Sequence, residues 1–107
     1  MSLMLERRRH ARLPIERPCK VYHRSSRQYL AASTCDLSEG GAMIRVDAKR
    51  SIGAGDEIEV RVSWGKGPVL KRASAIAAKV IRVPGQFASY QFLAVRFDRE
   101  QELALAA

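Results

Sequence analysis

Two short clusters hold the residues best suited to chemistry in this sequence of 107 residues. The first is the basic run Arg7-Arg8-Arg9-His10-Ala11-Arg12, and the second is the acidic turn Asp36-Leu37-Ser38-Glu39-Gly40-Gly41. Arginine bonds in pairs to phosphate oxygens or to the O6 and N7 acceptors of guanine, and its plane can stack on a base. No lysine lies between Met1 and Cys19, which favours specific recognition over a merely solubilising tail.

The acidic turn is compatible with two readings. In a structural reading, Asp36 and Ser38 satisfy the backbone of the turn, and the two glycines adopt left-handed conformations. In a functional reading, Asp36 accepts hydrogen bonds from guanine N1 and N2, the Ser38 hydroxyl donates or accepts, and Gly41 lets the backbone approach a ligand. The turn residues alone leave both readings open.

The charge is concentrated at the start of the chain. The net charge is +8, and residues 1–27 hold eight Lys/Arg and two Glu, so this segment carries +6 of it. No apolar run approaches the roughly 20 residues of a spanning helix, and residues 1–12 are charged where a secretory signal needs an apolar core. We therefore expect a cytoplasmic protein with no membrane insertion.

Catalytic and metal-binding sets are not recognisable in the sequence. Cys19 and Cys35 lie in strand-like segments and are interpreted as reduced structural thiols, which His10 and His23 do not extend into a ligand set. There is no serine with a recognisable histidine and acid, and no phosphate loop. The sequence predicts neither an enzyme nor a metal or cofactor site.

After Pro14, short β-rich runs separated by turn residues predict an all-β fold. Ile58, Val60, Val62 and Trp64 alternate with polar residues and predict one buried face. The expected turns are 53–56, 65–68 and 84–86, and the fifth strand should kink near 79–81. The candidate strands are residues 19–24, 28–35, 42–47, 57–64, 69–83 and 87–97. They favour a small antiparallel barrel, followed by a short helix from an Asp98 N-cap to Ala107.

The order and spacing of the two clusters resemble the motifs of the PilZ domain family. Arg8 and Arg12 match its Arg-x-x-x-Arg motif, and Asp36, Ser38 and Gly41 match its Asp-x-Ser-x-x-Gly motif. The resemblance implies one domain over residues 1–107: a flexible basic arm (1–13), a six-stranded antiparallel PilZ-type barrel (14–97) and the terminal helix (98–107). Ala94 departs from the family where a glycine is expected.

PilZ domains are bacterial receptors for the second messenger cyclic di-GMP, which they clamp between arm and barrel. The resemblance implies a ligand site at Arg7, Arg8, Arg12, Asp36, Ser38, Gly40 and Gly41. A basic residue at position 7 goes with two stacked ligands per protomer. We expect an adaptor whose arm becomes ordered on binding and which signals through an unidentified effector protein.

Two alternatives remain open at this stage. One is a PilZ-like module that only contacts proteins. The other is a basic barrel that binds RNA or single-stranded DNA, which would need exposed aromatic rings for stacking. Aromatic residues make up 7% of the chain. Trp64, Phe92 and Phe97 fit core positions, so this alternative would depend on Tyr22, Tyr29 and Tyr90.

Overall fold

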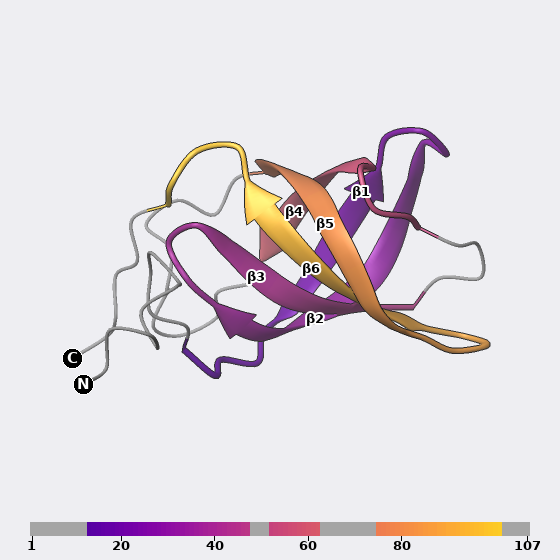
Figure 1. Cartoon of the computed structure of the whole chain (residues 1–107), viewed down its shortest axis with the longest axis horizontal. Coiled ribbons are helices and arrows are strands. Elements are labelled where there is room, and N and C mark those ends of the chain that lie inside the picture. The colour runs from indigo at the N-terminus through magenta and orange to yellow at the C-terminus, as the bar shows by residue number, and fades with distance from the viewer. Residues whose placement is uncertain (1–12, 48–51, 63–74, 102–107) are drawn as a thin grey trace.

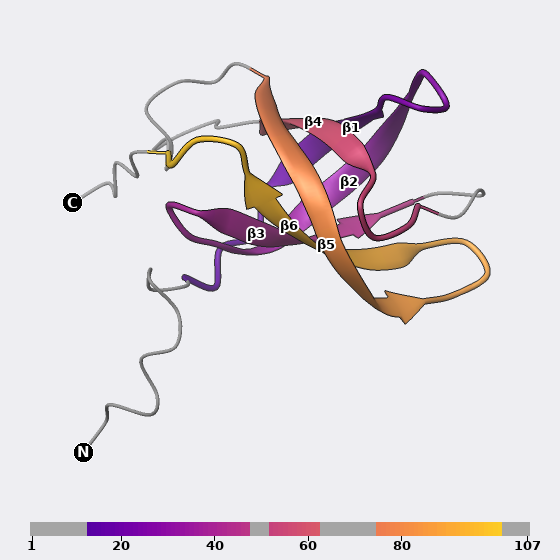
Figure 2. The ribbon, with the colours of Figure 1, turned by 45° about the horizontal axis from the view of Figure 1, so that its top comes forward.

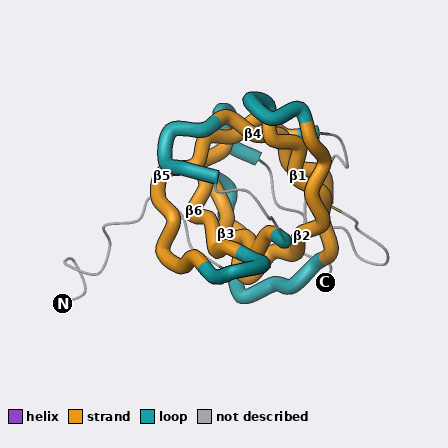
Figure 3. The backbone as a smooth tube through the Cα atoms, turned by 90° about the vertical axis from the view of Figure 1, so that its right-hand side faces the viewer, coloured by secondary structure: helices purple, strands orange, loops and turns teal. Residues whose placement is uncertain are grey.

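The strands close into a barrel. The computed structural model describes residues 13–47, 52–62 and 75–101 (Figure 1). The described strands are β1 (Pro18–His23), β2 (Gln28–Leu37), β3 (Gly41–Val46), β4 (Glu57–Val62), β5 (Ile76–Gln86) and β6 (Gln91–Phe97). Their order around the barrel is β1-β2-β3-β6-β5-β4, with antiparallel neighbours, and Figure 3 shows the ring. The predicted six-stranded antiparallel barrel is confirmed, and each described strand pairs with a neighbour on both sides.

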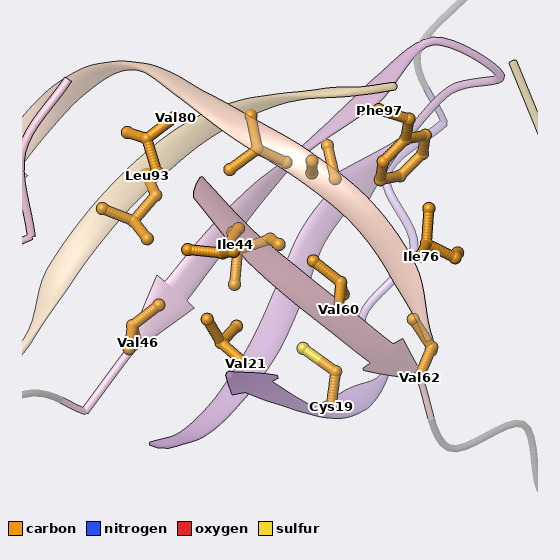
Figure 4. Close-up of a cluster of buried hydrophobic side chains, with 14 of the residues drawn as sticks. Cys19, Val21, Ile44, Val46, Val60, Val62, Ile76, Val80, Leu93 and Phe97 are labelled. Carbon is orange, nitrogen blue, oxygen red and sulfur yellow. The ribbon is translucent and has the colours of Figure 1, made fainter. Parts of the chain in front are cut away.

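The expected alternation of side chains builds the barrel core. Ile58, Val60 and Val62 of β4 are all buried, and so are the inward residues of β3 and β5 (Figure 4). A register shift between Val80 and Arg82 confirms the kink predicted in the fifth strand. Ile81, the residue within this shift, is 45% exposed.

The turn predicted at Pro84-Gly85-Gln86 is wrong. These residues belong to β5, and the chain reverses at residues 87–90, where the Phe87 amide donates to the Tyr90 carbonyl at 2.8 Å. A second register shift separates Arg82 from Gly85, so Pro84 lies where the ladder is already irregular and a missing amide proton is tolerated.

Some predictions fall on the ends of the described segments. No helix begins at Asp98, because residues 98–101 form a bend and irregular chain, and residues 102–107 lie outside the described residues. The basic arm up to Arg12, the predicted turn at 65–68 and Trp64 also lie outside them. Nothing in the described part of the chain forms a helix with the length and apolarity needed to cross a membrane.

The described aromatic residues lie in the core, in the β5–β6 hairpin, and as the neighbouring pair Tyr22 and Tyr29 on β1 and β2. Phe97 is buried, as predicted, whereas Phe92 is only half-buried. Phe92 meets Phe87 and Tyr90 edge-on, while Phe87 and Tyr90 stack with ring centroids 4.7 Å apart. This hairpin projects beyond the rest of the barrel (Figure 2). The expectation of a core position for Phe92 is therefore wrong.

The two cysteines are free thiols. Burial, with a smaller effect of Cys35, raises the pKa of Cys19 to about 12. Burial and then the nearby Asp36 also raise the pKa of Cys35. Because the thiolate is the reactive form, these environments support the reading of both residues as structural thiols.

His23 connects two turns at the end of the barrel where β1 meets β2. Its Nδ1 lies 2.8 Å from Ser26 Oγ, and its Nε2 lies 2.8 Å from Asp56 Oδ2, which also accepts from the Gly53 amide at 3.0 Å. This serine, histidine and acid set is not recognisable in the sequence, because Asp56 lies 33 residues after His23. Since the ring is 6% exposed and both its nitrogens are engaged, we assign the set to joining the two turns.

This connection makes stability dependent on Asp56. The hydrogen bond from Gly53, and then His23, hold the pKa of Asp56 below its ordinary 3.8 despite partial burial. Because the folded-state pKa is the lower one, the carboxylate stabilises the fold fully above about pH 4, and this contribution disappears as pH falls through the folded-state pKa. Asp56→Ala should lower the free energy of unfolding by about 1–3 kcal/mol at pH 7, measured in urea. The variant should also lose less stability than the native chain as the pH falls below about 4.

The control is Asp47→Ala, whose side chain is 62% exposed and approaches Arg45 at only 3.9 Å. It should change the free energy of unfolding by no more than about 0.5 kcal/mol. An Asp56 variant with the stability and pH profile of the native chain would contradict the assigned role.

Candidate functional site

The turn between β2 and β3 is built around the Ser38 side chain. Its hydroxyl donates to the Gly41 carbonyl at 3.2 Å and accepts from the Gly40 and Gly41 amides at 3.3 and 3.1 Å. The hydroxyl thus uses its donor and both acceptor positions within the turn. Ser38 is 5% exposed, and the structure supports its structural role in shaping the loop.

A β-bulge turns Asp36 to the outer surface. The β2–β3 register shifts between Thr34 and Asp36, which inserts Cys35 as an extra residue. Thr34 and Leu37, three positions apart, therefore both point inward, at 1% and 0% exposure, while Asp36 lies outside between them. Asp36 Oδ1 accepts from the Met43 amide at 3.2 Å. Bulges commonly redirect a side chain at functional sites, and this one presents a carboxylate beside the turn.

Gly41 is needed for the close approach of two strands. A Cβ on Gly41 would collide with the Val95 carbonyl oxygen and lie 3.3 Å from the Arg96 Cα on β6. Gly55, with φ of 93°, is the only positive-φ glycine among those described, so the left-handed conformations expected at Gly40 and Gly41 are wrong. The reason for glycine at position 41 is space between strands.

The base of the arginine arm is attached directly to the motif turn. The Leu13 amide donates to the Leu37 carbonyl at 2.8 Å, and the Leu37 amide donates back at 2.9 Å. Leu37 stands between Asp36 and Ser38, and Leu13 follows Arg12 directly in the sequence. The point where the arm joins the barrel is therefore fixed next to the acidic turn.

Thr34 secures the segment that follows Leu13. Its amide donates to the Arg17 carbonyl at 2.9 Å, and its hydroxyl donates to the Ile15 carbonyl at 2.6 Å and accepts from the Arg17 amide at 2.8 Å. These bonds hold residues 13–17 along β2, so several contacts fix the segment between Leu13 and β1.

The end of the described chain supports the turn from its other side. The Phe97 amide donates to the Gly40 carbonyl at 2.8 Å, and the Gln101 amide donates to the Glu39 carbonyl at 2.7 Å. Both described ends and the β2–β3 turn lie at the same end of the barrel (Figure 1). The turn is thus held by the segments before β1 and after β6.

Asp36, Ser38, Gly40 and Gly41 lie in one turn, in which Ser38 bonds to both glycines and Asp36 bonds to Met43. Arg7, Arg8 and Arg12 lie outside the described residues. A chain of five residues spans at most roughly 18 Å, so Arg8, five positions before Leu13, is within reach of the turn.

A family model described as the PilZ domain matches residues 6–106. The chain belongs to the PilZ domain family. A comparison with curated proteins found no match. PilZ is a family of cyclic di-GMP receptors and not of enzymes, and both of its motifs, the arginine pair and the acidic turn, fall within the matched residues.

The PilZ barrel also carries cations that the sequence analysis did not single out. Arg96 on β6 lies opposite Gly41, the first residue of β3 after the turn. Lys79 on β5 lies opposite Arg96, so Gly41, Arg96 and Lys79 form one row across the three strands, with two exposed cations in it. Strand register, which the sequence does not display, creates this row. Ala94 lies between Met43 and Arg82 on the outer face and is 1% exposed, so the barrel accommodates its methyl group.

The contact at Gly41 predicts a stability effect. Gly41→Ala should lower the free energy of unfolding by about 1–3 kcal/mol in urea, because the new methyl group forces β3 away from β6. Gly53→Ala is the matched control: its Cβ would meet nothing within 4 Å, and it should change stability by about 0.5 kcal/mol or less. Equal stability of the two variants would show that Gly41 is not required for strand packing.

Proposed function

We propose that this PilZ domain is a cyclic di-GMP receptor that binds its ligand between the arginine arm and the β2–β3 turn. The pairing of Leu13 with Leu37 is the observation that supports the proposal, because it brings the residue that follows Arg12 to the acidic turn. The family match supports the identity of the ligand.

The two motifs offer complementary chemistry to this ligand. Cyclic di-GMP has two phosphodiester anions and two guanines. Arg8 and Arg12 supply planar donors for phosphate oxygens or for guanine O6 and N7. Asp36, turned outward by the bulge, accepts from guanine N1 and N2, which arginine cannot do. Ser38 shapes the turn that positions this carboxylate.

The strength of these contacts is sufficient for a receptor. A charge-assisted hydrogen bond contributes roughly 1.5–3 kcal/mol, and a micromolar complex corresponds to roughly 8 kcal/mol. Two or three arginines together with Asp36 supply roughly 4.5–12 kcal/mol before the cost of ordering the arm, so they can approach this range. The loss of any one of these contacts should therefore weaken the binding of cyclic di-GMP measurably.

Signalling follows from ordering of the arm. Ligand binding would fix residues 1–12 against the barrel and move several positive charges with them. The resulting surface is the proposed recognition element for an effector protein. No chemical bond changes in this mechanism.

Nucleic-acid binding is the second candidate, because Phe87 is 52% exposed beside Tyr90 and Arg45 stacks on Tyr90 at 4.2 Å. These rings lie in the turn just before Gln91, the β6 residue that pairs with Val46 at the opposite end of β3 from Gly41. They therefore cannot share a ligand with the β2–β3 turn. RNA binding would weaken steeply as salt rises, whereas the guanine-reading site should keep its preference for cyclic di-GMP over other cyclic dinucleotides.

Calorimetric titration with cyclic di-GMP, with GMP as a ligand control, tests the proposed function. The native chain should bind selectively, and Arg8→Ala and Asp36→Asn should each weaken binding at least about tenfold, since each removes a charge-assisted contact. Asparagine keeps an oxygen for the Met43 amide, so Asp36→Asn tests the charge with little effect on the turn.

The control is Arg24→Ala, which removes an arginine from the turn between β1 and β2. Arg24 contacts Glu57 and Glu59 of β4 and precedes β2, at the end of that strand opposite the motif turn. The loss of its side chain should leave the affinity for cyclic di-GMP within about twofold of native. Native affinity in both Arg8→Ala and Asp36→Asn would rule out the proposed site.

A stoichiometry of two ligands per protomer is the finer part of the proposal. Arg7 directly precedes the arginine motif, and this additional guanidinium group would stabilise a stacked pair of ligands. The native chain should therefore titrate with two ligands, and Arg7→Leu with one. Light scattering of the complex separates two ligands per chain from dimerisation, and a single ligand on the native chain would contradict the role of Arg7.

A further inference from the structure

Two exposed cations oppose each other on the outer surface of the barrel. Lys20 on β1 lies directly opposite Arg61 on β4. Within residues 13–47, 52–62 and 75–101, no acidic oxygen lies within 4.0 Å of either cation. Like charges at directly opposed positions destabilise a sheet. The pair is therefore not explained by its contribution to stability.

The pair borders a surface hollow of about 440 Å³. The other lining residues are apolar and mostly small: Pro18, Cys19, Ala31, Ala32 and Val62. Ala31 on β2 lies opposite Lys20, so the short side chain beside the cation opens the hollow. Its volume falls in the range of roughly 300–1,000 Å³ that is typical of small-molecule sites.

Strand pairing restricts what this hollow can hold. β1 is paired with β2 on one side and with β4 on the other, so β1 itself offers an extended peptide no free edge to which it could add as a strand. An occupant must be held by side chains. The two cations suit one anionic group, and the apolar floor suits a compact apolar body.

We propose that the hollow over β1, β2 and β4 binds a small amphipathic anion, a molecule with one carboxylate, sulfonate or phosphate group and an apolar body. This site shares no residue with the motif turn at Asp36–Gly41. The opposed cations Lys20 and Arg61 are the anion-binding groups, and Ala31 provides the space.

The fluorescent probe 8-anilinonaphthalene-1-sulfonate tests the proposal on the intact chain, because it combines a sulfonate with an apolar ring system. Native protein should give a saturable rise in fluorescence. Lys20→Gln with Arg61→Gln should raise the probe Kd at least about tenfold while stability in urea is retained or increased, since the repulsion is removed. Ala31→Leu, which fills the hollow without changing charge, should also weaken probe binding.

The matched control is Lys79→Gln with Arg96→Gln, which removes the other directly opposed cation pair and the same charge. Because charges far from the probe are screened, its Kd should stay within about twofold of native. Equal losses in both double variants would show a response to net charge alone, and native binding in Ala31→Leu would contradict the site.

Competition with the bound probe identifies the preferred anionic group and tests whether the probe lies in the hollow or at the motif turn. Octanoate or octyl phosphate should displace the probe, and the better competitor distinguishes a carboxylate from a phosphate head group. Displacement by neither would overturn the proposal. Displacement by cyclic di-GMP would also overturn it, because the probe would then lie in the PilZ ligand site.

Discussion

The paired backbone hydrogen bonds between Leu13 and Leu37 are the constraint on which the candidate site depends. They place the start of the barrel beside the acidic turn. Without this pairing, the arginine motif and Asp36 would be two independent surface features. With it, the residue that follows Arg12 lies beside an outward carboxylate, and the proposed shared site depends on this placement.

Much of the turn chemistry prepares the site and does not face a ligand. The Ser38 hydroxyl bonds to the backbone of Gly40 and Gly41. Gly41, which has no side chain, allows β3 to pack closely against β6. The bulge at Cys35 then turns Asp36 outward. The structural and functional readings of the turn are therefore compatible, because the residues that build the turn determine where the carboxylate lies.

Local patterns predicted the barrel, but contacts between distant segments determined the site. The alternation of Ile58, Val60 and Val62 defined a buried face because strand periodicity is visible within eight residues. The bulge at Cys35 depends on register with β3, and the role of Gly41 depends on Val95, so neither was visible in the sequence. Pro84 and Gly85 suggested a turn because their chemistry is ambiguous: an irregular strand tolerates them as well.

The central claim is that the arm and the turn form one binding site. The most direct measurement is a nuclear magnetic resonance titration with cyclic di-GMP in which backbone amide signals are followed residue by residue. If both motifs bind the same ligand, the signals of residues 7–13 and of Asp36–Gly41 should shift together and with the same midpoint. Shifts confined to the arm, or different midpoints for arm and turn, would contradict a shared site.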